Sequence, residues 1–265
     1  MGVPIALTIA GSDSSGGAGI GADLKVFSAL GVYGACVVTA LTAQNTKGVF
    51  AIHAVAPDLV SAQMDAVFSD LEVGAVKIGM LANSSIIEAV GSGLARHQSR
   101  NVVLDPILAA SSGAELLRAD AIGALQQLAG QARVFTPNLF EAAALLEVPM
   151  AQDETEMRAQ AEKLLVLGAR AVLIKGGHGG GKDSVDLLVE GDRCTRLAAP
   201  RIGTRNTHGT GCTLASAIAA GLAKGLSLDE AVREAKDYVT AAIAAADRLE
   251  VGSGRGPLHH FHKWW

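Results

Sequence analysis

The stretch IALTIAGSDSSGGAGIGADLKVFSAL, residues 5–30, decides how the fold is interpreted. Its first residues, Ile5 to Ala10, are almost continuously apolar, which is typical of a strand buried on both faces of a sheet. A glycine-rich turn follows, and Ala18 to Leu30 then carries apolar residues at helical spacing. A buried strand that leads through a loop into a helix predicts the first part of a β-α-β unit.

The same alternation of short apolar runs and helical segments continues along the chain, which predicts an α/β fold with a mostly parallel sheet and crossover helices. The predicted strands are Ala35 to Leu41, Ala75 to Ile78, Val102 to Leu104, Ala132 to Thr136 and Ala171 to Lys175. The predicted helices are Asp58 to Asp70, Ser84 to His97, Ala119 to Leu128, Leu139 to Leu146, Glu154 to Leu167, Gly211 to Lys224 and Leu228 to Leu249.

One part of the chain departs from this alternation. Asp183 to Glu190 and Arg193 to Ala198 are predicted as two strands joined by a turn at Gly191-Asp192, which places an antiparallel edge on the sheet. No Pro/Ser-rich linker, charge block or repeat divides the sequence. Residues 1–265 are therefore expected to form one domain.

Composition argues against several classes of protein. A net charge of -4 over 265 residues, with 4% aromatic residues, leaves no broad basic or stacking surface for nucleic acid or an anionic membrane. No apolar run approaches a membrane span in length. The three cysteines, Cys36, Cys194 and Cys212, lie far apart in the sequence. They argue against a disulfide framework or a zinc cluster and favour the cytoplasm.

Ligands of open α/β sheets bind outside the carboxyl ends of the strands, so the residues that follow each strand are the first candidates for a site. Small and polar residues concentrate at these positions. They are Gly11 to Asp23, Thr42 to Asn45, Gly79-Met80, Asp105-Pro106, Pro137-Asn138 and Gly176 to His178.

The first glycine-rich loop is ambiguous. Gly17 to Ala22 fits the relaxed GxGxxG/A fingerprint of dinucleotide-binding proteins, which also requires an acidic residue about 20 positions further on. The predicted second strand ends in VVTALTAQ and offers no carboxylate. An NAD(P)-binding oxidoreductase is thus a distant alternative, and the other interpretation is a tight turn with close helix packing.

The second loop, NTHGTGCT at residues 206–213, runs directly into a helix of small apolar residues. Unpaired amides and the positive end of a helix dipole bind anions, and glycine lets a phosphate approach the backbone closely. Lys175, at the end of a predicted strand, would supply a counter-charge. No GxxxxGK[ST] sequence occurs, so we predict a phosphate loop that is not a Walker A motif, or else a glycine-rich helix cap.

A family resemblance rests on the stretches ALTIAGSDSSGGAGIGADLKVFSALGVYG, TALTAQNTKGV, KIGML, VVLDP, TPNLFEAAALL, VLIKGGH and NTHGTGCTL, in this order. With the ending GPLHHFHKWW, they make the chain resemble the hydroxymethylpyrimidine/phosphomethylpyrimidine kinases of thiamine biosynthesis, within the ribokinase-like superfamily. The resemblance spans essentially the whole chain. It implies a three-layer ribokinase-like fold, ATP and Mg²⁺ as cofactors, and a homodimer. It also implies two phosphoryl transfers, first to 4-amino-5-hydroxymethyl-2-methylpyrimidine and then to its monophosphate.

The resemblance assigns the acceptor site. Gln44 is the family's pyrimidine-binding residue, and its planar amide matches a ring nitrogen and an amino group. Asp23, expected in the first turn of the first helix, is a second candidate, or a carboxylate favoured there by the helix dipole. Gly11 and Met80 are expected to wall the ring. Ile107 stands where the family usually has another aliphatic residue.

Phosphoryl transfer depends mainly on positioning and on charge stabilisation. The amides of Gly209, Thr210, Gly211 and Cys212 are expected to hold the transferred group. Lys175 is expected to neutralise oxygens of ATP.

The resemblance also places a nucleotide and metal region around an NxxE pair. Asn138 and Glu141 would lie on one face of a first helical turn, with Asn138 toward the nucleotide. Glu141 and Asp105 are expected near Mg²⁺, often through waters, because Mg²⁺ keeps much of its hydration.

Cys212 stands where the wider superfamily commonly has an aspartate that acts as base, and the pyrimidine kinases also carry cysteine there. A thiol pKa of about 8.5 is lowered at helix N-termini and near cations, so a thiolate base is one hypothesis. The other is that the thiol is only part of the anion hole.

Three further points remain open from the sequence. The run from Ser111 to Glu115 departs from the family pattern, which usually has an acid directly after the SG pair. His259, His260 and His262 are expected to dock with the tail rather than bind a metal. A pyridoxal-type kinase of the same superfamily is the nearest alternative function, although Gln44 with Asn45-Thr46 favours the pyrimidine.

Overall fold

The computed structural model describes residues 2–109, 116–117, 119–177 and 181–265. In these ranges the strands are β1 (Ile5–Gly11), β2 (Tyr33–Asn45), β3 (Gly48–Ala54), β4 (Ala75–Ile78), β5 (Val102–Leu104), β6 (Val134–Phe135), β7 (Val172–Lys175), β8 (Asp183–Glu190) and β9 (Arg193–Pro200). The α-helices are α1 (Gly19–Ala29), α2 (Pro57–Phe68), α3 (Ser84–Arg96), α4 (Ile122–Ala129), α5 (Leu139–Leu146), α6 (Glu154–Leu165), α7 (Thr210–Ala223) and α8 (Leu228–Ala244). Two 3₁₀ turns are η1 (Ala119–Ala121) and η2 (Ala246–Arg248).

The described strands form one sheet in the order β3-β2-β1-β4-β5-β6-β7-β8-β9. From β2 to β7 all neighbouring strands run parallel. The β8–β9 hairpin adds the antiparallel edge that the sequence predicts. This arrangement brings the carboxyl ends of the parallel strands to one side of the sheet.

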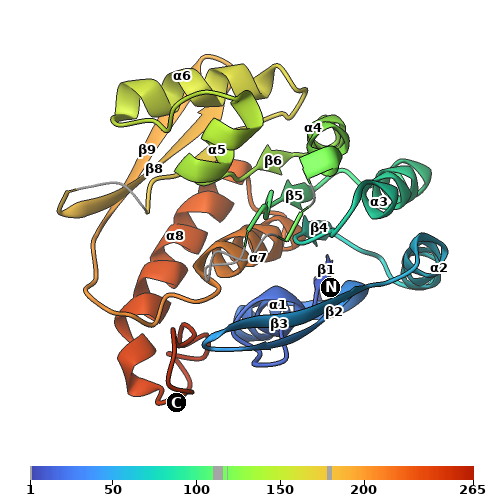
Figure 1. Ribbon diagram of the computed structural model, residues 1–265, viewed down its shortest axis with the longest axis horizontal. Coiled ribbons are helices and arrows are strands. Elements are labelled where there is room, and N and C mark those ends of the chain that lie inside the picture. The colour runs from blue at the N-terminus through green and yellow to red at the C-terminus, as the bar shows by residue number, and fades with distance from the viewer. Residues whose placement is uncertain (1, 110–115, 118, 178–180) are drawn as a thin grey trace.

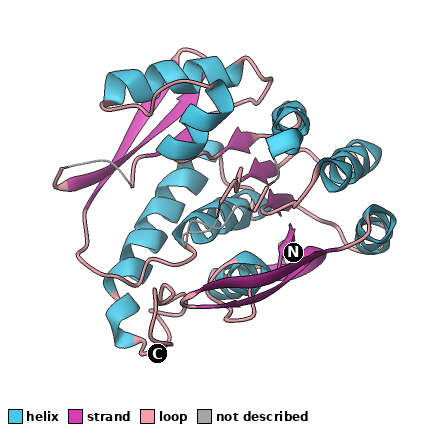
Figure 2. Ribbon diagram, viewed as in Figure 1, coloured by secondary structure: helices cyan, strands magenta, loops and turns pink. Residues whose placement is uncertain are grey.

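Helices cover both faces of the sheet, so the predicted three-layer α/β architecture is confirmed (Figures 1 and 2). One buried cluster joins the sheet to α2 through α6, and it includes Met64, Ile86 and Leu164. A second cluster joins the other face to α1, α7 and α8, and includes Phe27 and Ile218. No helix in the described ranges is long and apolar enough to cross a membrane.

A second antiparallel edge was not predicted. β2 extends to Asn45 and turns into β3, which pairs with it antiparallel from Ala40↔Ala54 to Asn45↔Gly48. Most of β3 is exposed, so it lacks the alternation of buried and exposed positions that marks a half-buried strand. Because β3 lies at the edge of the sheet and is largely exposed, its hydrophobic pattern does not predict a strand.

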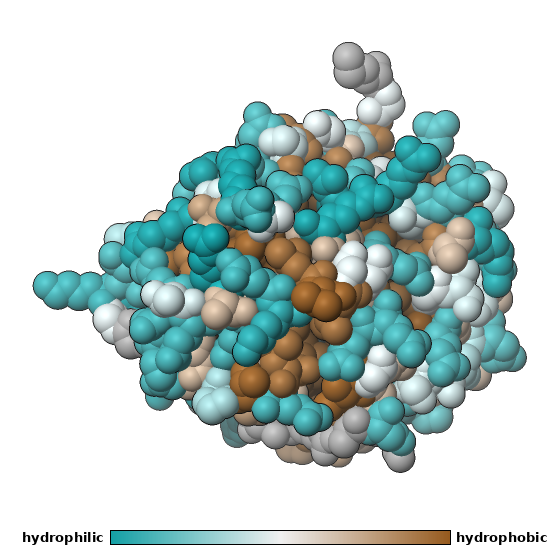
Figure 3. Space-filling model, turned by 90° about the horizontal axis from the view of Figure 1, so that it is seen from above, coloured by the Kyte–Doolittle hydropathy of each residue, from teal (hydrophilic) through white to brown (hydrophobic). Residues whose placement is uncertain are grey.

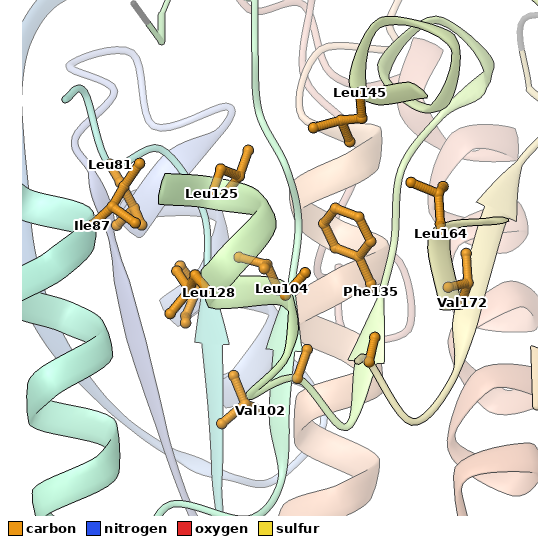
Figure 4. Close-up of a cluster of buried hydrophobic side chains, with 14 of the residues drawn as sticks. Leu81, Ile87, Val102, Leu104, Leu125, Leu128, Phe135, Leu145, Leu164 and Val172 are labelled. Carbon is orange, nitrogen blue, oxygen red and sulfur yellow. The ribbon is translucent and has the colours of Figure 1, made fainter. Parts of the chain in front are cut away.

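Phe135 of β6 is one of the largest fully buried side chains. Figure 4 shows it among Leu104, Leu145 and Leu164, which come from a neighbouring strand and from the helices α5 and α6. The outer surface over α5 and α6 is mainly hydrophilic, with hydrophobic residues gathered near its centre (Figure 3). Phe140 of α5 is also a phenylalanine, but it is 60% exposed and lies outside the core.

We expect Phe135→Ala to lower the free energy of unfolding by about 3 to 5 kcal/mol, because it removes a buried ring and leaves a cavity. The matched change Phe140→Ala should cost no more than about 0.5 kcal/mol. Urea unfolding of both variants measures the difference. Equal losses would contradict the assignment of Phe135 to the core.

Candidate functional site

The structure brings five predicted site residues to the carboxyl edge of the parallel sheet. Gly11 ends β1, and Met80 follows β4. Asp105 follows β5, Asn138 follows β6, and Lys175 ends β7. Because β1, β4, β5, β6 and β7 are neighbours in this order, residues far apart in the sequence meet along a single line.

A lysine and two carboxylates form the charged centre of this edge. Lys175 Nζ donates to Asp105 Oδ1 at 2.6 Å and lies 3.8 Å from Glu141 Oε2. Burial lowers the pKa of Lys175, but the carboxylates of Asp105 and Glu141 outweigh it and raise the pKa overall. A β-carbon built on Gly211 would stand 3.3 Å from Lys175 Nζ and 3.4 Å from Asp105 Oδ2. The charged cluster therefore faces the start of α7.

Asn138 and Glu141 form a reciprocal capping box at the start of α5. Asn138 Oδ1 accepts from the Glu141 amide at 2.9 Å, and Glu141 Oε2 accepts from the Asn138 amide at 2.8 Å. Burial raises the pKa of Glu141 to about 7, with a further rise from Asp105, although Lys175 acts against both. Two carboxyl groups thus lie beside the single ammonium group of Lys175. When both are ionised, the three side chains carry a net negative charge.

The amino terminus of α7 has no capping side chain that would keep other groups away from its backbone. Gly209 is its N-cap, with a left-handed φ of 83° and no side-chain cap. A β-carbon at Gly209 would overlap the carbonyl oxygen of Gly17, so glycine is required for two independent reasons. The first amides of a helix have no partner within the helix. No side chain caps α7, although the Thr210 amide donates to the Thr207 carbonyl at 3.3 Å. Anion binding by the other first amides of α7 stays a prediction.

Cys212 lies in the first turn of α7, 7% exposed, where the Gly19 amide at the start of α1 donates to its sulfur. Burial raises the pKa of the thiol to about 11, and Lys77 only partly counteracts this. The expected lowering of the thiol pKa was therefore wrong. Desolvation exceeds the effect of the helix terminus, and Cys212 is a neutral thiol at neutral pH in this structure.

Gln44 lies near the end of β2 and faces the anion loop, which is formed by residues 206–213. Its Nε2 is 3.4 Å from His208 Nε2, and Thr42 Oγ1 donates to its Oε1 at 3.4 Å. His208 Nε2 also lies 2.8 Å from Asp13 Oδ2. Burial acts to raise the pKa of Asp13, but hydrogen bonds from His208 and Ser15 lower it to about 2. Gln44, His208 and Asp13 therefore form a chain that links the end of β2 to the loops that carry Asp13 and His208.

Asp23 does not have the position that the sequence suggests. It is the fifth residue of α1, so it lies beyond the first turn, and it is fully buried. Lys77 Nζ donates to its two oxygens at 3.0 and 2.8 Å. Thr8 and Ser216 donate to it at 2.6 and 2.7 Å. With both oxygens engaged inside the protein and no exposed surface, Asp23 is a buried ion-pair partner of Lys77 and not the substrate contact that the sequence suggests.

The predicted walls of the acceptor site lie close together. A β-carbon built on Gly11 would stand 3.0 Å from Met80 Sδ, so these two residues touch across β1 and β4. Met80 is 6% exposed, and its carbonyl accepts from Thr39 Oγ1 at 2.6 Å. Ile107 Cδ1 lies 3.5 Å from the equivalent position on Gly79. The structure thus gathers the three residues on one side of the edge.

Two expectations fall partly or wholly outside the described residues: the Ser111 to Glu115 departure, and His178 after Lys175. The C-terminal histidines behave as expected for a docked tail. His259 and His260 are buried, and His260 Nε2 lies 3.1 Å from Thr213 Oγ1. Among the residues that the structure describes, no group of three or more His, Cys, Asp or Glu side chains is arranged to hold a metal ion.

The reading of the sequence missed Asp13, His208 and Lys77. Lys77 stands inside the apolar strand β4 and is fully buried, a placement that lysine adopts only when it is paired. Burial lowers its pKa, but Asp23, then Cys212 and Asp105, raise it overall. A lysine within a buried strand was therefore an available signal. The sequence contains no such signal for Asp13 and His208, because the two residues that pair are 195 positions apart.

An uncapped helix terminus beside a lysine and two carboxylates, at the carboxyl edge of a parallel sheet, is a site suited to a phosphotransferase. The family model described as phosphomethylpyrimidine kinase matches residues 13–259. The chain belongs to this family.

Relatives agree with this assignment. The chain is 62% identical over 262 residues to the hydroxymethylpyrimidine/phosphomethylpyrimidine kinase of Rhizobium meliloti (strain 1021), covering 98% of both. It is 51% identical over 255 residues to the thiamine biosynthesis bifunctional protein ThiED of Geobacter sulfurreducens, covering 96% of this chain and 51% of that protein. An ADP complex of Bacillus subtilis pyridoxal kinase superposes with a TM-score of 0.89 at 37% identity, covering 98% of each chain.

The raised pKa of Glu141 predicts a pH-dependent stability. Its folded pKa of about 7 lies above the ordinary value of 4.5, so the folded state holds the proton more tightly between these values. The contribution of Glu141 to the free energy of unfolding therefore falls as pH rises through this window. Glutamine keeps the acceptor for the cap but cannot ionise. We expect Glu141→Gln to become more stable relative to the wild type between about pH 5 and pH 7.

Urea unfolding across this pH range tests the expectation. Glu88→Gln, at an exposed position of α3, is the matched control. If both variants follow the wild type in parallel, Glu141 does not titrate in this window.

Proposed function

We propose that the chain transfers the terminal phosphoryl group of ATP to the hydroxymethyl group of 4-amino-5-hydroxymethyl-2-methylpyrimidine, and then phosphorylates the monophosphate to the diphosphate. One observation carries the proposal: the Lys175–Asp105 pair faces Gly211 at the open terminus of α7. The names of the relatives and the ADP complex of a structural neighbour support it. These two phosphorylations belong to thiamine biosynthesis. A single kinase domain would span residues 1–265.

The anion loop would hold the phosphoryl group in transit. The amides of Gly209, Thr210, Gly211 and Cys212 would face this group at the start of α7, where the helix dipole favours negative charge. The Thr210 amide would leave the Thr207 carbonyl, to which it donates at 3.3 Å. Lys175 would neutralise phosphate oxygens, since its ammonium lies against Gly211. Such a site works by alignment and charge, as phosphoryl transfer requires.

The carboxylate cluster fits Mg²⁺. Two oxygen-bearing groups, Asp105 and Glu141, lie beside the single ammonium of Lys175, at 2.6 and 3.8 Å. Mg²⁺ is commonly held by one or two carboxylates together with waters and phosphate oxygens. When bound, it would supply charge neutralisation of the phosphates. Asn138 would stay near the nucleotide while it caps α5.

The acceptor would lie between Gln44 and the terminus of α7. Gln44 offers a donor and an acceptor on one plane, which suits the ring nitrogen and the amino group of an aminopyrimidine. Gly11, Met80 and Ile107 would wall the ring. The absence of a side chain on Gly11 lets Met80 Sδ pack directly against the end of β1.

We also propose a homodimer in the cytoplasm. β3 is an edge strand, and the hairpin that it forms with β2 exposes Leu41 on one face and Phe50 and Ile52 on the other, at 54%, 69% and 41%. Exposed apolar edge strands are normally covered. Sedimentation of the purified protein as a monomer would contradict the dimer. Three free cysteines accord with a reducing compartment, and recovery of the native protein outside the cytoplasm on fractionation would contradict that placement.

A pyridoxal-type activity is the second candidate, favoured by the similarity to the Bacillus subtilis pyridoxal kinase. Incubation with MgATP and either acceptor, followed by phosphorus NMR, separates the two. We expect both the mono- and the diphosphate of the pyrimidine. If neither forms, the proposed function is wrong, and a phosphorylated pyridoxal product would then favour the second candidate.

Gln44→Ala should raise the KM for the pyrimidine by about tenfold, because at least one hydrogen bond to the ring is lost and a polar partner is left unpaired. The KM for ATP should stay within about twofold. Gln152→Ala, at an exposed position, is the matched control. Steady-state kinetics with each substrate varied in turn give both values. Equal effects on the two would place Gln44 outside the acceptor site.

Cys212→Ala should lower kcat by about tenfold or more and leave both KM values within about twofold, if the thiol acts on the reacting hydroxyl or phosphate. Cys194→Ala, a partly buried thiol in the β8–β9 hairpin, is the control. Initial rates at saturating substrates report kcat. Unchanged turnover with both acceptors would remove Cys212 from the chemistry.

A further inference from the structure

The C-terminal segment contacts the turn that follows Gln44. The amides of Gly254 and Arg255 donate to Thr46 Oγ1 and to the Thr46 carbonyl, at 3.1 and 2.9 Å. Thr46 comes two residues after Gln44, in the turn between β2 and β3. A β-carbon at Gly252 or Gly254 would overlap Thr46, so the segment lies directly on this turn.

The same segment contacts the anion loop. The His208 amide donates to the Gly256 carbonyl at 3.0 Å, and the Gly256 amide donates to Asn206 Oδ1 at 3.1 Å. A β-carbon at Gly256 would overlap the Asn206 side chain. His208 also pairs with Pro257 in a short parallel bridge. Both ends of the acceptor site are thus bonded to one stretch of chain.

The rest of the segment is anchored in the protein interior. Leu258 is fully buried, and the His259 amide donates to the Ala242 carbonyl of α8 at 3.1 Å. Tyr238 Oη donates to the His260 carbonyl at 2.7 Å. His260 Nε2 lies 3.1 Å from Thr213 Oγ1, one residue after Cys212. These contacts fix residues 252–260 to α7 and α8.

The hairpin that carries Gln44 needs such support. Pairing between β1 and β2 ends at Gly11↔Ala40, so the part of β2 that follows projects beyond β1. A register shift between Ala43 and Gln44 further interrupts the β2–β3 ladder. Thr42 still bonds to Ser12 and Ser14 in the loop after β1, whereas the backbone of Gln44 pairs within the described sheet only with β3.

We infer that residues 252–260 act as a strap that holds the Gln44 turn in a fixed position relative to the start of α7, and thereby sets the affinity for the acceptor. The inference rests on the proposed function, in which Gln44 binds the pyrimidine. The strap residues are positioning residues, because they act through Thr46 and His208. Lys175 and Asp105, on the nucleotide side, belong to β7 and to the end of β5, away from these contacts.

Gly254→Ala tests the strap, because the added methyl group displaces Thr46. We expect the KM for the pyrimidine to rise by about tenfold, with the KM for ATP within about twofold. Thr46→Val should raise the same KM by a few fold through loss of one hydrogen bond, and Thr46→Ser should restore it. Gly203→Ala is the matched control, since a β-carbon there meets no atom within 4 Å.

Amide hydrogen exchange of Gly254→Ala supplies a readout that does not depend on activity. Exchange at residues 42–49 and 206–208 should be faster than in Gly203→Ala, while α7, β5 and β7 stay protected. Unchanged exchange at both segments, or equal rises in both KM values, would overturn the strap. If the wild type shows no pyrimidine phosphorylation, the proposed function fails by itself, and the exchange comparison still decides whether the strap exists.

Discussion

The start of α7 is the constraint on which the rest of the site depends. The helix begins at a glycine with left-handed backbone, packed against the carbonyl of Gly17, so no side chain fits and none caps the helix. Gly211 then lies against Lys175 and Asp105, and the Gly19 amide reaches the sulfur of Cys212. Two helix termini and three strand ends therefore converge where an anion would lie. A larger residue at Gly209 would separate them.

Buried ion pairs hold this convergence in place. Lys77 with Asp23 lies beneath Cys212, and Lys236 with Asp186 lies behind the turn after β7, where Asp186 also accepts from the Gly176 amide at 2.9 Å. Removal of one partner of such a pair typically costs about 3 to 5 kcal/mol, because a charge is left buried and unpaired. The pairs bridge elements that are distant in sequence. They therefore fix the directions in which the strand ends, and Lys175 with them, present their side chains.

Much of this site could be predicted from the sequence, because parallel topology determines what meets at the strand ends. Once strands were assigned before Asp105, Asn138 and Lys175, their proximity followed from the order of the sheet. Contacts that depend on packing in three dimensions could not be predicted in this way. The burial of Asp23 requires Lys77 from another strand, and the position of the Gln44 turn depends on a tail some 200 residues away.

The pKa of Cys212 is a second property that could not be predicted from the sequence alone. Local sequence suggests an acidified thiol, since a helix terminus and a nearby cation both favour the anion. In the folded protein the cation, Lys77, is already paired with Asp23, and the sulfur is buried close to two carboxylates. Desolvation then decides the sign of the shift. Only the full three-dimensional arrangement reveals which effect is larger.

A neutral thiol at this position suits the reaction proposed for the site. A carboxylate at position 212 would add a third acid to Asp23 and Asp105, and the nearby ammonium groups of Lys77 and Lys175 are already paired with those two. It would also repel a phosphate at the start of α7, where the amides attract one. In the second proposed transfer the acceptor is itself a phosphate, so it brings negative charge to the terminus together with the phosphoryl group. A side chain that stays uncharged there lets both anions share the same helix amides.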